Sequence, residues 1–255
     1  MLVRVFKKKL IKFFVVISCM FMIITEKPVF AQVPIYEIDE VKYKISAHSA
    51  YVTDWNDLRR DTIFTVPSEV FVNEKKINVV GIDRRTFNNC KNLRHIILPN
   101  TVKWVGSYAF ANSSLTTIVL SDSIKRINEG AFYGCEFLRE IELPKSLKYI
   151  GDYFFGNCKS LKNISLPDSI ESIGEMSFLN CYGLNRMILP KLTKTIKESA
   201  FGWCINLSEV IFPDSICAIE KKAFVGCSNL KRVRISKKCI IEESAFPLET
   251  LIERY

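Results

Sequence analysis

The sequence predicts an α/β repeat protein, a solenoid in which every turn contributes one short strand and one short helical turn. Two observations support this prediction. A phenylalanine recurs every 22 or 23 residues between residues 87 and 246, and a strand-like LxxIxL segment follows it in most copies. A unit of this length cannot bury its own apolar face, whereas stacked units share one continuous core.

Residues 1–31 have the pattern of a secretory signal peptide. Basic residues in the first twelve positions precede an apolar run of twelve, and small residues mark a cleavage site after Ala31. Such a run is too short to span a bilayer comfortably, which favours export over anchoring. The alternative, a lipoprotein modified at Cys19, is disfavoured because the residues after this cysteine stay apolar. We therefore expect a secreted, periplasmic or cell-surface protein.

Residues 32–78 do not follow the repeat and form a predicted β cap. Apolar and polar residues alternate in VKYKISAHSAYVTD (41–54) and in TIFTVPSEVFVNEKKINVVGI (62–82), with turn-like breaks. This pattern predicts β-hairpins. Hairpins here would cover the first open end of the solenoid, where strand edges and core side chains would otherwise be exposed.

Residues 79–247 contain the repeats. Segments such as RHIILP (94–99) alternate with the period of a half-buried strand. Segments such as GDYFFGNC (151–158) lie between the strands, and their glycine, asparagine and short apolar pair predict one helical or 3₁₀ turn. The recurring phenylalanines, each expected to point into the core, are Phe87, Phe110, Phe132, Phe155, Phe178, Phe201, Phe224 and Phe246.

The full repeat, SIxxIGxxAFxxCxxLxxIxLP, resembles the BspA-like leucine-rich repeats of bacterial secreted and surface proteins. The resemblance covers residues 79–247 and implies a leucine-rich-repeat solenoid with a hairpin segment before the first repeat. It also implies adhesion, or the binding of host and neighbour-cell proteins. The chain departs from the common leucine-rich repeat because proline or serine replaces the asparagine ladder after the strand. Residues 248–255 would form a C-terminal cap.

The charge of the chain argues against one class of partner. The formal net charge of +9 falls to +4 when residues 1–31 are removed, because this segment holds six basic residues and one acidic residue. The basic character therefore belongs mostly to the predicted signal peptide. A charge of this size on an exported protein does not suggest a nucleic-acid binder.

Six cysteines share one position of the repeat, three residues after the phenylalanine. Such a column places sulfurs in a line, whereas zinc needs four converging ligands, and no CxxC is present. A nucleophile would need a partner base, and neither His48 nor His95 recurs with the cysteines. Packed free thiols are favoured, with disulfides between neighbouring turns as the open alternative. Cys217 lies off this column and is expected to be the most exposed thiol. The column consists of Cys90, Cys135, Cys158, Cys181, Cys204 and Cys227.

Two surfaces are candidates for partner binding. On each strand, the residues between the inward positions point outward, and they vary from turn to turn over a fixed frame. Apolar residues there are not needed for the core. The predicted partner-binding face consists of Ile97, Val119, Arg186, Ile188, Glu209, Ile211, Arg232 and Arg234. A basic stripe, which could attract an acidic polysaccharide or protein, consists of Lys103, Lys125, Lys148 and Lys194.

The sequence shows no catalytic constellation, metal motif or phosphate-binding loop, so we expect neither an enzyme nor a cofactor. The predicted function is an adhesin-like interaction module that binds an extracellular protein or glycan through the outward strand face. The alternative is a structural or spacer component of the cell envelope without a dedicated ligand. Nucleic acid is not an expected partner, and no transmembrane segment is expected after removal of the signal peptide.

Overall fold

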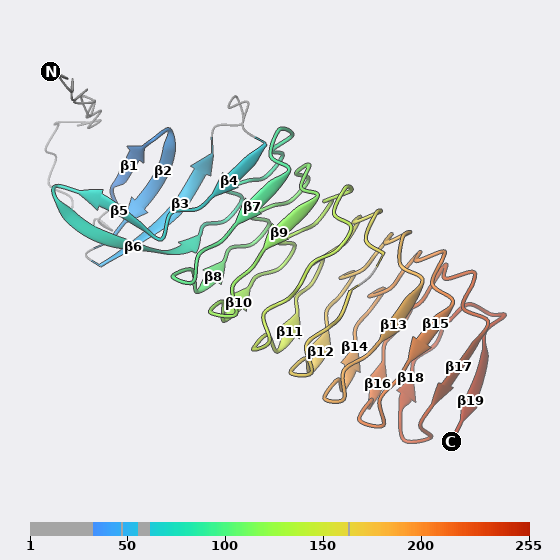
Figure 1. Ribbon diagram of the computed structural model, residues 1–255. Helices are drawn as coiled ribbons and strands as arrows, with labels where there is room; N and C mark the ends of the chain where they lie inside the picture. Colours follow the sequence, from blue (N-terminus) through green and yellow to red (C-terminus); the bar gives the residue numbers. More distant parts are fainter. Residues whose placement is uncertain (1–32, 47, 56–61, 163) are drawn as a thin grey trace, which may run out of the picture. The chain divides into compact units, whose positions relative to one another are not determined.

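The computed structural model describes residues 33–46, 48–55, 62–162 and 164–255, which belong to one compact unit, Val33–Tyr255. The predicted signal peptide and Cys19 lie outside the described residues. The described part is a β-solenoid of about eight turns, with antiparallel strands at its N-terminal end (Figure 1). The predicted solenoid and the predicted N-terminal hairpin strands are thus confirmed.

The N-terminal strands form two antiparallel arrangements. β1 (Ile35–Ile38), β2 (Val41–Ile45) and β3 (Ser49–Trp55) pair in that order. β5 (Glu69–Val72) and β6 (Lys75–Ile82) form a second hairpin. The two-residue connections of the β1–β2 and β5–β6 hairpins all have positive φ, between 48° and 65°, which is the turn type whose twist matches that of paired strands.

One sheet joins these strands to the repeats. β3 pairs in parallel with β6, and the end of β6 pairs in parallel with β8 (Trp104–Val105) of the first full turn. Gly81 and Ile82 of β6 are the register partners of Trp104 and Val105. The N-terminal strands and the solenoid therefore share a continuous hydrogen-bonded sheet.

Each turn adds a short strand on one side of the coil. These strands, which we name the short-strand sheet, lie parallel to one another and point a buried isoleucine or valine inward at all but the last turn. After β8 they are β10 (Arg126–Ile127), β11 (Tyr149–Ile150), β12 (Ser172–Ile173), β14 (Thr195–Ile196), β16 (Ala218–Ile219) and β18 (Ile240–Ile241).

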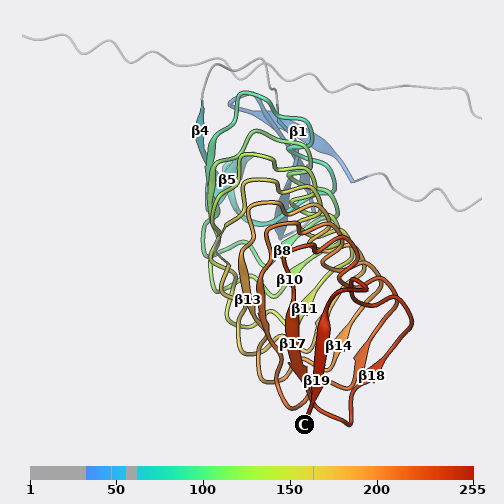
Figure 2. The same ribbon diagram turned by 90° about the vertical axis from the view of Figure 1, so that its right-hand side faces the viewer.

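A second set of parallel strands lies on another side of the coil, and we name its outward surface the strand face. Figure 2 shows β13 and β17 of this set on one side and β14 and β18 of the short-strand sheet on the other. The set consists of β4 (Ile63–Thr65), β7 (His95–Ile97), β9 (Thr117–Val119), β13 (Arg186–Ile188), β15 (Glu209–Ile211), β17 (Arg232–Ile235) and β19 (Leu251–Arg254).

The core between these sides is a stack of the recurring phenylalanines. The ring centroids of Phe178 and Phe201 are 5.0 Å apart with an interplanar angle of 1°, and those of Phe201 and Phe224 are 5.1 Å apart at 3°. These rings are fully buried. Isoleucine and valine side chains from both sets of strands, and leucines from the segments between them, belong to the same core, so one column of apolar side chains runs through all the turns.

The segment around each phenylalanine is not helical, so the predicted helical turn is wrong. None of the described residues lies in a helix. In most turns the residues two before and two after the phenylalanine are left-handed, as Tyr153 (φ 57°) and Asn157 (φ 62°) are around Phe155. A right-handed helix cannot continue through such residues. The asparagine and glycine that indicated a helical turn are the residues that tolerate this conformation.

The backbone of this segment bonds across turns instead. Tyr153, Phe155 and Asn157 each donate their N–H to a carbonyl of the next turn at 2.7 Å. Between them, Gly156 donates to the carbonyl of Tyr153 in its own turn at 3.1 Å. Every second amide therefore points along the solenoid, and the backbone of each turn depends on its neighbour.

Side-chain hydroxyls satisfy carbonyls at the corner where the asparagine ladder is missing. Ser169 donates to the carbonyl of Leu147 in the preceding turn at 2.6 Å. In the next turn Leu192 stands at the serine position, and Thr193 donates to the carbonyl of Ile170 at 3.1 Å. Thr193 is fully buried and Leu192 is exposed. The hydroxyl has moved by one residue, and this shift turns a leucine toward solvent.

Candidate functional site

The strand face presents two apolar pairs. Ile97 and Val119 are register partners on β7 and β9, and Ile188 and Ile211 are register partners on β13 and β15. Their side chains are 40%, 55%, 53% and 40% exposed, in that order. The structure therefore brings the four predicted apolar residues together as two patches rather than as one.

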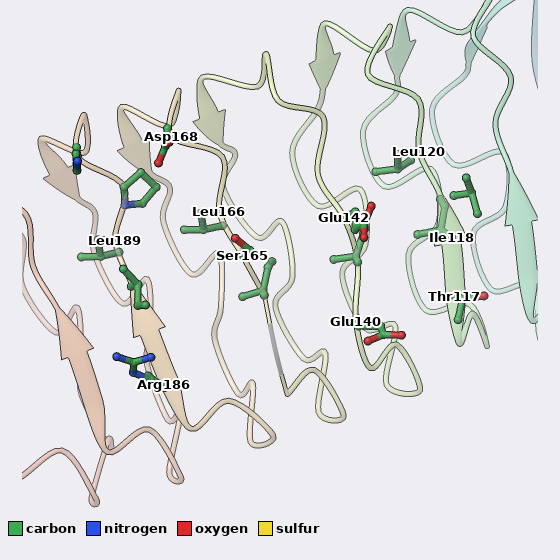
Figure 3. Close-up of a pocket in the computed structure, with 16 residues that line it drawn as sticks. Thr117, Ile118, Leu120, Glu140, Glu142, Ser165, Leu166, Asp168, Arg186 and Leu189 are labelled. Atoms are coloured by element: carbon green, nitrogen blue, oxygen red, sulfur yellow. The ribbon is translucent and has the colours of Figure 1, made fainter.

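A hollow of about 900 Å³ lies between the two pairs. Residues of four successive turns line it, among them Val119 and Ile188 at its two ends. Figure 3 shows Leu120, Leu166 and Leu189 in one row across the turns, and it shows Glu140 and Glu142 separated from Arg186 by the turn of Ser165.

The irregular backbone under the hollow was not anticipated from the sequence. Regular strands were expected there, but residues 141–142 and 164–166 are irregular between β9 and β13. Glu140 and Glu142 line the hollow, although neither belongs to the predicted partner-binding face. The alternation of apolar and polar residues is the same in these turns as in their neighbours, so it contains no signal for the interruption.

Each charged residue of the predicted face has a partner: Arg186 and Glu209 pair with each other, whereas Arg232 and Arg234 contact residues outside the face. Arg186 donates from Nε to Glu209 Oε2 at 2.6 Å, across β13 and β15. Arg232 Nε lies 3.3 Å from a glutamate oxygen of β19. The guanidinium of Arg234 lies 4.8 Å from the ring centroid of Tyr255. These contacts hold the charged side chains in place. The exposed apolar pairs take no part in them.

The C-terminal tyrosine ties the last turn to an earlier corner. The hydroxyl of Tyr255 donates to Asp214 Oδ1 at 2.6 Å. This hydrogen bond to the carboxylate raises the pKa of Tyr255. Residues 248–255, expected as a cap, thus contain β19, which extends the strand face in parallel with β17.

Glu171 divides the predicted basic stripe. Lys148 Nζ lies 3.7 Å from Glu171 Oε1, and the backbone N–H of Lys194 donates to the Glu171 carbonyl in the next turn. Lys103, Lys125 and Lys148 therefore lie on one side of Glu171, and Lys194 lies on the other. The sequence interpretation overlooked the residues that directly follow the first three lysines and point outward from the short-strand sheet, namely Trp104, Arg126 and Tyr149.

The cysteine column is a packing and hydrogen-bonding feature. Cys158 and Cys181 donate from Sγ to the carbonyls of Phe132 and Phe155 in the preceding turn, both at 3.2 Å. Burial raises the pKa of Cys135 to about 11 and also raises the pKa of Cys158, Cys181 and Cys204. Thiols held in this state are not nucleophilic. Packed thiols, the favoured interpretation, agree with the absence of any disulfide among the described cysteines.

Cys217 is exposed, whereas the other seven described cysteines are buried, so the prediction that it is the most exposed thiol is confirmed. Within residues 33–255, apart from those left undescribed, no cluster of histidine, cysteine, aspartate and glutamate has the arrangement of a metal site. A search of the same residues finds no helix with the length and hydropathy to cross a membrane.

The comparisons with known proteins agree with this geometry. The family model described as BspA type leucine rich repeat region matches residues 65–185 and 149–254, well over half of the sequence. The chain therefore belongs to the BspA-type leucine-rich repeat family, a repeat family whose members are typically not enzymes. No curated protein matches the sequence.

Two solved structures illustrate the likeness. A leucine-rich repeat protein from T. pallidum is 29% identical with a TM-score of 0.66, and the match covers 74% of this chain and 87% of that chain. The pneumococcal vaccine antigen PcpA is 18% identical with a TM-score of 0.51, and the match covers 88% of each chain. At 18% identity the second likeness shows the fold alone.

Proposed function

We propose that this protein is a secreted or cell-surface interaction module, adhesin-like, that binds an extracellular protein through the strand face. The signal-peptide pattern of residues 1–31 supports the location. A regular scaffold with an irregular outward surface supports a binding role, because the frame keeps each variable side chain at a fixed place.

The exposed pair formed by Ile188 and Ile211 carries the proposal. The inward residues that directly precede them on the two strands, Met187 and Val210, already fill the core beneath. Packing therefore does not require apolar residues on the outside. Apolar side chains gathered on a surface often mark a contact, because their burial in a complex is favourable by roughly 25 cal/mol per Å². The neighbouring hollow gives this patch a shape that a partner can complement.

The test is a binding screen of the purified protein against extracellular-matrix proteins and mucins, followed by the variant Ile188→Glu/Ile211→Glu. Two charges in the centre of an apolar contact are expected to weaken a saturable interaction by at least about tenfold. The melting temperature is measured in parallel, because two glutamates at register partners repel each other and a small decrease is expected without loss of the fold.

The matched control is Leu192→Glu/Ile240→Glu, which places the same two charges at exposed aliphatic residues that lie off the strand face. It should keep the wild-type affinity. Equal losses in both variants would point to a general charge effect. The absence of any saturable partner would instead favour the alternative, a structural or spacer component of the cell envelope.

A further inference from the structure

We propose that the first turns of the short-strand sheet bind an acidic polysaccharide. In this site a sugar ring lies on the rings of Tyr51 and Trp104, and Lys103, Lys125 and Arg126 pair with its acidic groups. This surface is separate from the strand face, so the proposal does not depend on the function proposed above.

A glycine creates the aromatic platform. Gly81 of β6 lies between Tyr51 of β3 and Trp104 of β8, as the register of these parallel strands shows. A Cβ atom at residue 81 would overlap the indole of Trp104, so the missing side chain makes room for that ring. The indole reaches across the glycine to Tyr51, and the two ring centroids are 5.5 Å apart. Figure 1 shows β3, β6 and β8 following one another at this end of the solenoid.

Cations surround the platform. Lys103 directly precedes Trp104, and Arg126 is the register partner of Trp104 in the next turn. The backbone N–H of Lys125 donates to the Lys103 carbonyl at 2.8 Å, so these two lysines also belong to adjacent turns. All three basic side chains are exposed, and none of them is in an ion pair with a described carboxylate; Lys103 Nζ donates only to the Asn100 carbonyl, at 2.9 Å.

Neighbouring cations differ in this respect. Lys44, at the other side of Tyr51, forms an ion pair with Asp83, and Lys148 lies near Glu171. The uncompensated positive charge is therefore concentrated beside the rings of Tyr51 and Trp104. Arginine and lysine at this place can pair with carboxylate or sulfate groups, and arginine can do so with two parallel hydrogen bonds.

The combination favours an acidic glycan over other polyanions. A pyranose has an apolar ring face that packs on tyrosine and tryptophan, whose rings combine apolar area with a polar tip. An acidic protein would use the cations without needing the rings. Single-stranded nucleic acid also combines stacking with charge, but it uses a row of rings along a groove, and here two rings stand tilted at 43°.

The experiment measures binding of a heparin decasaccharide to the full chain by calorimetry at low salt. The variant Lys125→Gln/Arg126→Gln is expected to weaken binding about tenfold, and added salt should weaken the wild-type interaction. Lys191→Gln/Lys237→Gln removes the same charge from exposed lysines at another corner and should change the affinity less than about twofold.

A second variant tests the rings. Trp104→Leu should weaken binding of the decasaccharide but leave binding of inorganic polyphosphate, which has no ring, unchanged. If Trp104→Leu does not fold, the variant Trp203→Phe is used instead. It retains two tryptophans, the half-exposed Trp104 and the buried Trp55, and the decasaccharide should quench the fluorescence of Trp104.

Three results would overturn the proposal. The first is no measurable binding of the decasaccharide. The second is an equal loss in the two double variants, since this would mean attraction by net charge alone. The third is tighter binding of polyphosphate or of an oligothymidylate than of the decasaccharide, because the two aromatic rings would then not make the site selective for a sugar.

Discussion

In five turns the carbonyl of the recurring phenylalanine accepts two hydrogen bonds, one of them from a thiol; the five residues are Phe110, Phe132, Phe155, Phe178 and Phe201. The Phe155 carbonyl accepts the N–H of Cys158 in its own turn at 3.0 Å and the S–H of Cys181 in the next turn at 3.2 Å. A thiol at this position fills a small apolar slot and also supplies a weak donor. Ser113 can take the same place because it too carries a donor, and its hydroxyl contacts the sulfur of Cys135 at 3.5 Å.

A second feature at the scale of the residue is a buried hydroxyl that forms no hydrogen bond. Ser177 is fully buried at a position where most turns, including the next one with Ala200, have alanine, and its Oγ has no hydrogen-bond partner among the described residues. Removing an unsatisfied buried hydroxyl is expected to stabilise, so Ser177→Ala should raise the free energy of unfolding by about 1 kcal/mol. Urea unfolding measures this. Ser169→Ala removes a hydroxyl that is hydrogen-bonded and should lower stability, and a loss in both variants would contradict the argument.

At the scale of the element, the sequence predicts strands better than turns. The alternation in segments such as 94–99 depends only on which side chains face the core, so it identified β7 and its counterparts directly. The turn around Phe155 depends on backbone conformation, and the residues two before each phenylalanine include tyrosine, methionine and lysine, which give no left-handed signal. The asparagine or glycine that most turns have two residues after the phenylalanine, together with Gly130 before Phe132, could have indicated that a helix is interrupted there.

The candidate sites show the same division. The outward positions of Ile188 and Ile211 follow from alternation within single strands. The position of the aromatic platform does not follow from such alternation. Tyr51, Gly81 and Trp104 meet only through the register of β3, β6 and β8, and β3 and most of β6 lie outside the periodic repeat. The hollow beside Ile188 also depends on an interruption of strand geometry that the repeat pattern does not record.

The left-handed positions of the turn give a prediction at this scale. Gly226 has φ 74°, and a Cβ there would lie 2.6 Å from the ring of Trp203 in the preceding turn. Gly226→Ala is therefore expected to lower the free energy of unfolding by about 2 kcal/mol, through backbone strain and ring overlap together.

A double-mutant cycle with Trp203→Ala separates the two causes of this loss. In the Trp203→Ala background, Gly226→Ala should cost only the backbone part, which is about 1 kcal/mol. An identical cost in both backgrounds would show that the overlap with the ring has no energetic weight. Urea unfolding of the four proteins supplies the cycle.

At the scale of the whole described unit, several kinds of interaction join neighbouring turns. The alternate amides of the turn, the hydroxyls of the corner, the thiols of the column and the stacked phenylalanine rings all join one turn to the next. Stability in such a molecule is approximately a sum over turns and their interfaces. The position of a defect along the solenoid should therefore decide how far its effect spreads.

Phenylalanine truncations at the middle and at the end test this additivity. Phe178 contacts Phe155 and Phe201, with ring centroids 5.5 and 5.0 Å away, whereas Phe246 of the last turn stacks on Phe224 alone, at 4.9 Å, with one edge contact to Phe212. Phe178→Ala is expected to cost about 3–5 kcal/mol, and Phe246→Ala about half as much, because it breaks one interface between turns rather than two.

Hydrogen exchange should then distinguish a local effect from a global one. In Phe246→Ala the amides of β17 and β19 should exchange faster while those of β7 and β9 keep their wild-type protection, because the last turn can open without the rest. In Phe178→Ala protection should fall on both sides of the defect. Equal loss of protection along the whole solenoid in both variants would mean that the described unit unfolds in one cooperative step, and the nearest-neighbour description would then be wrong.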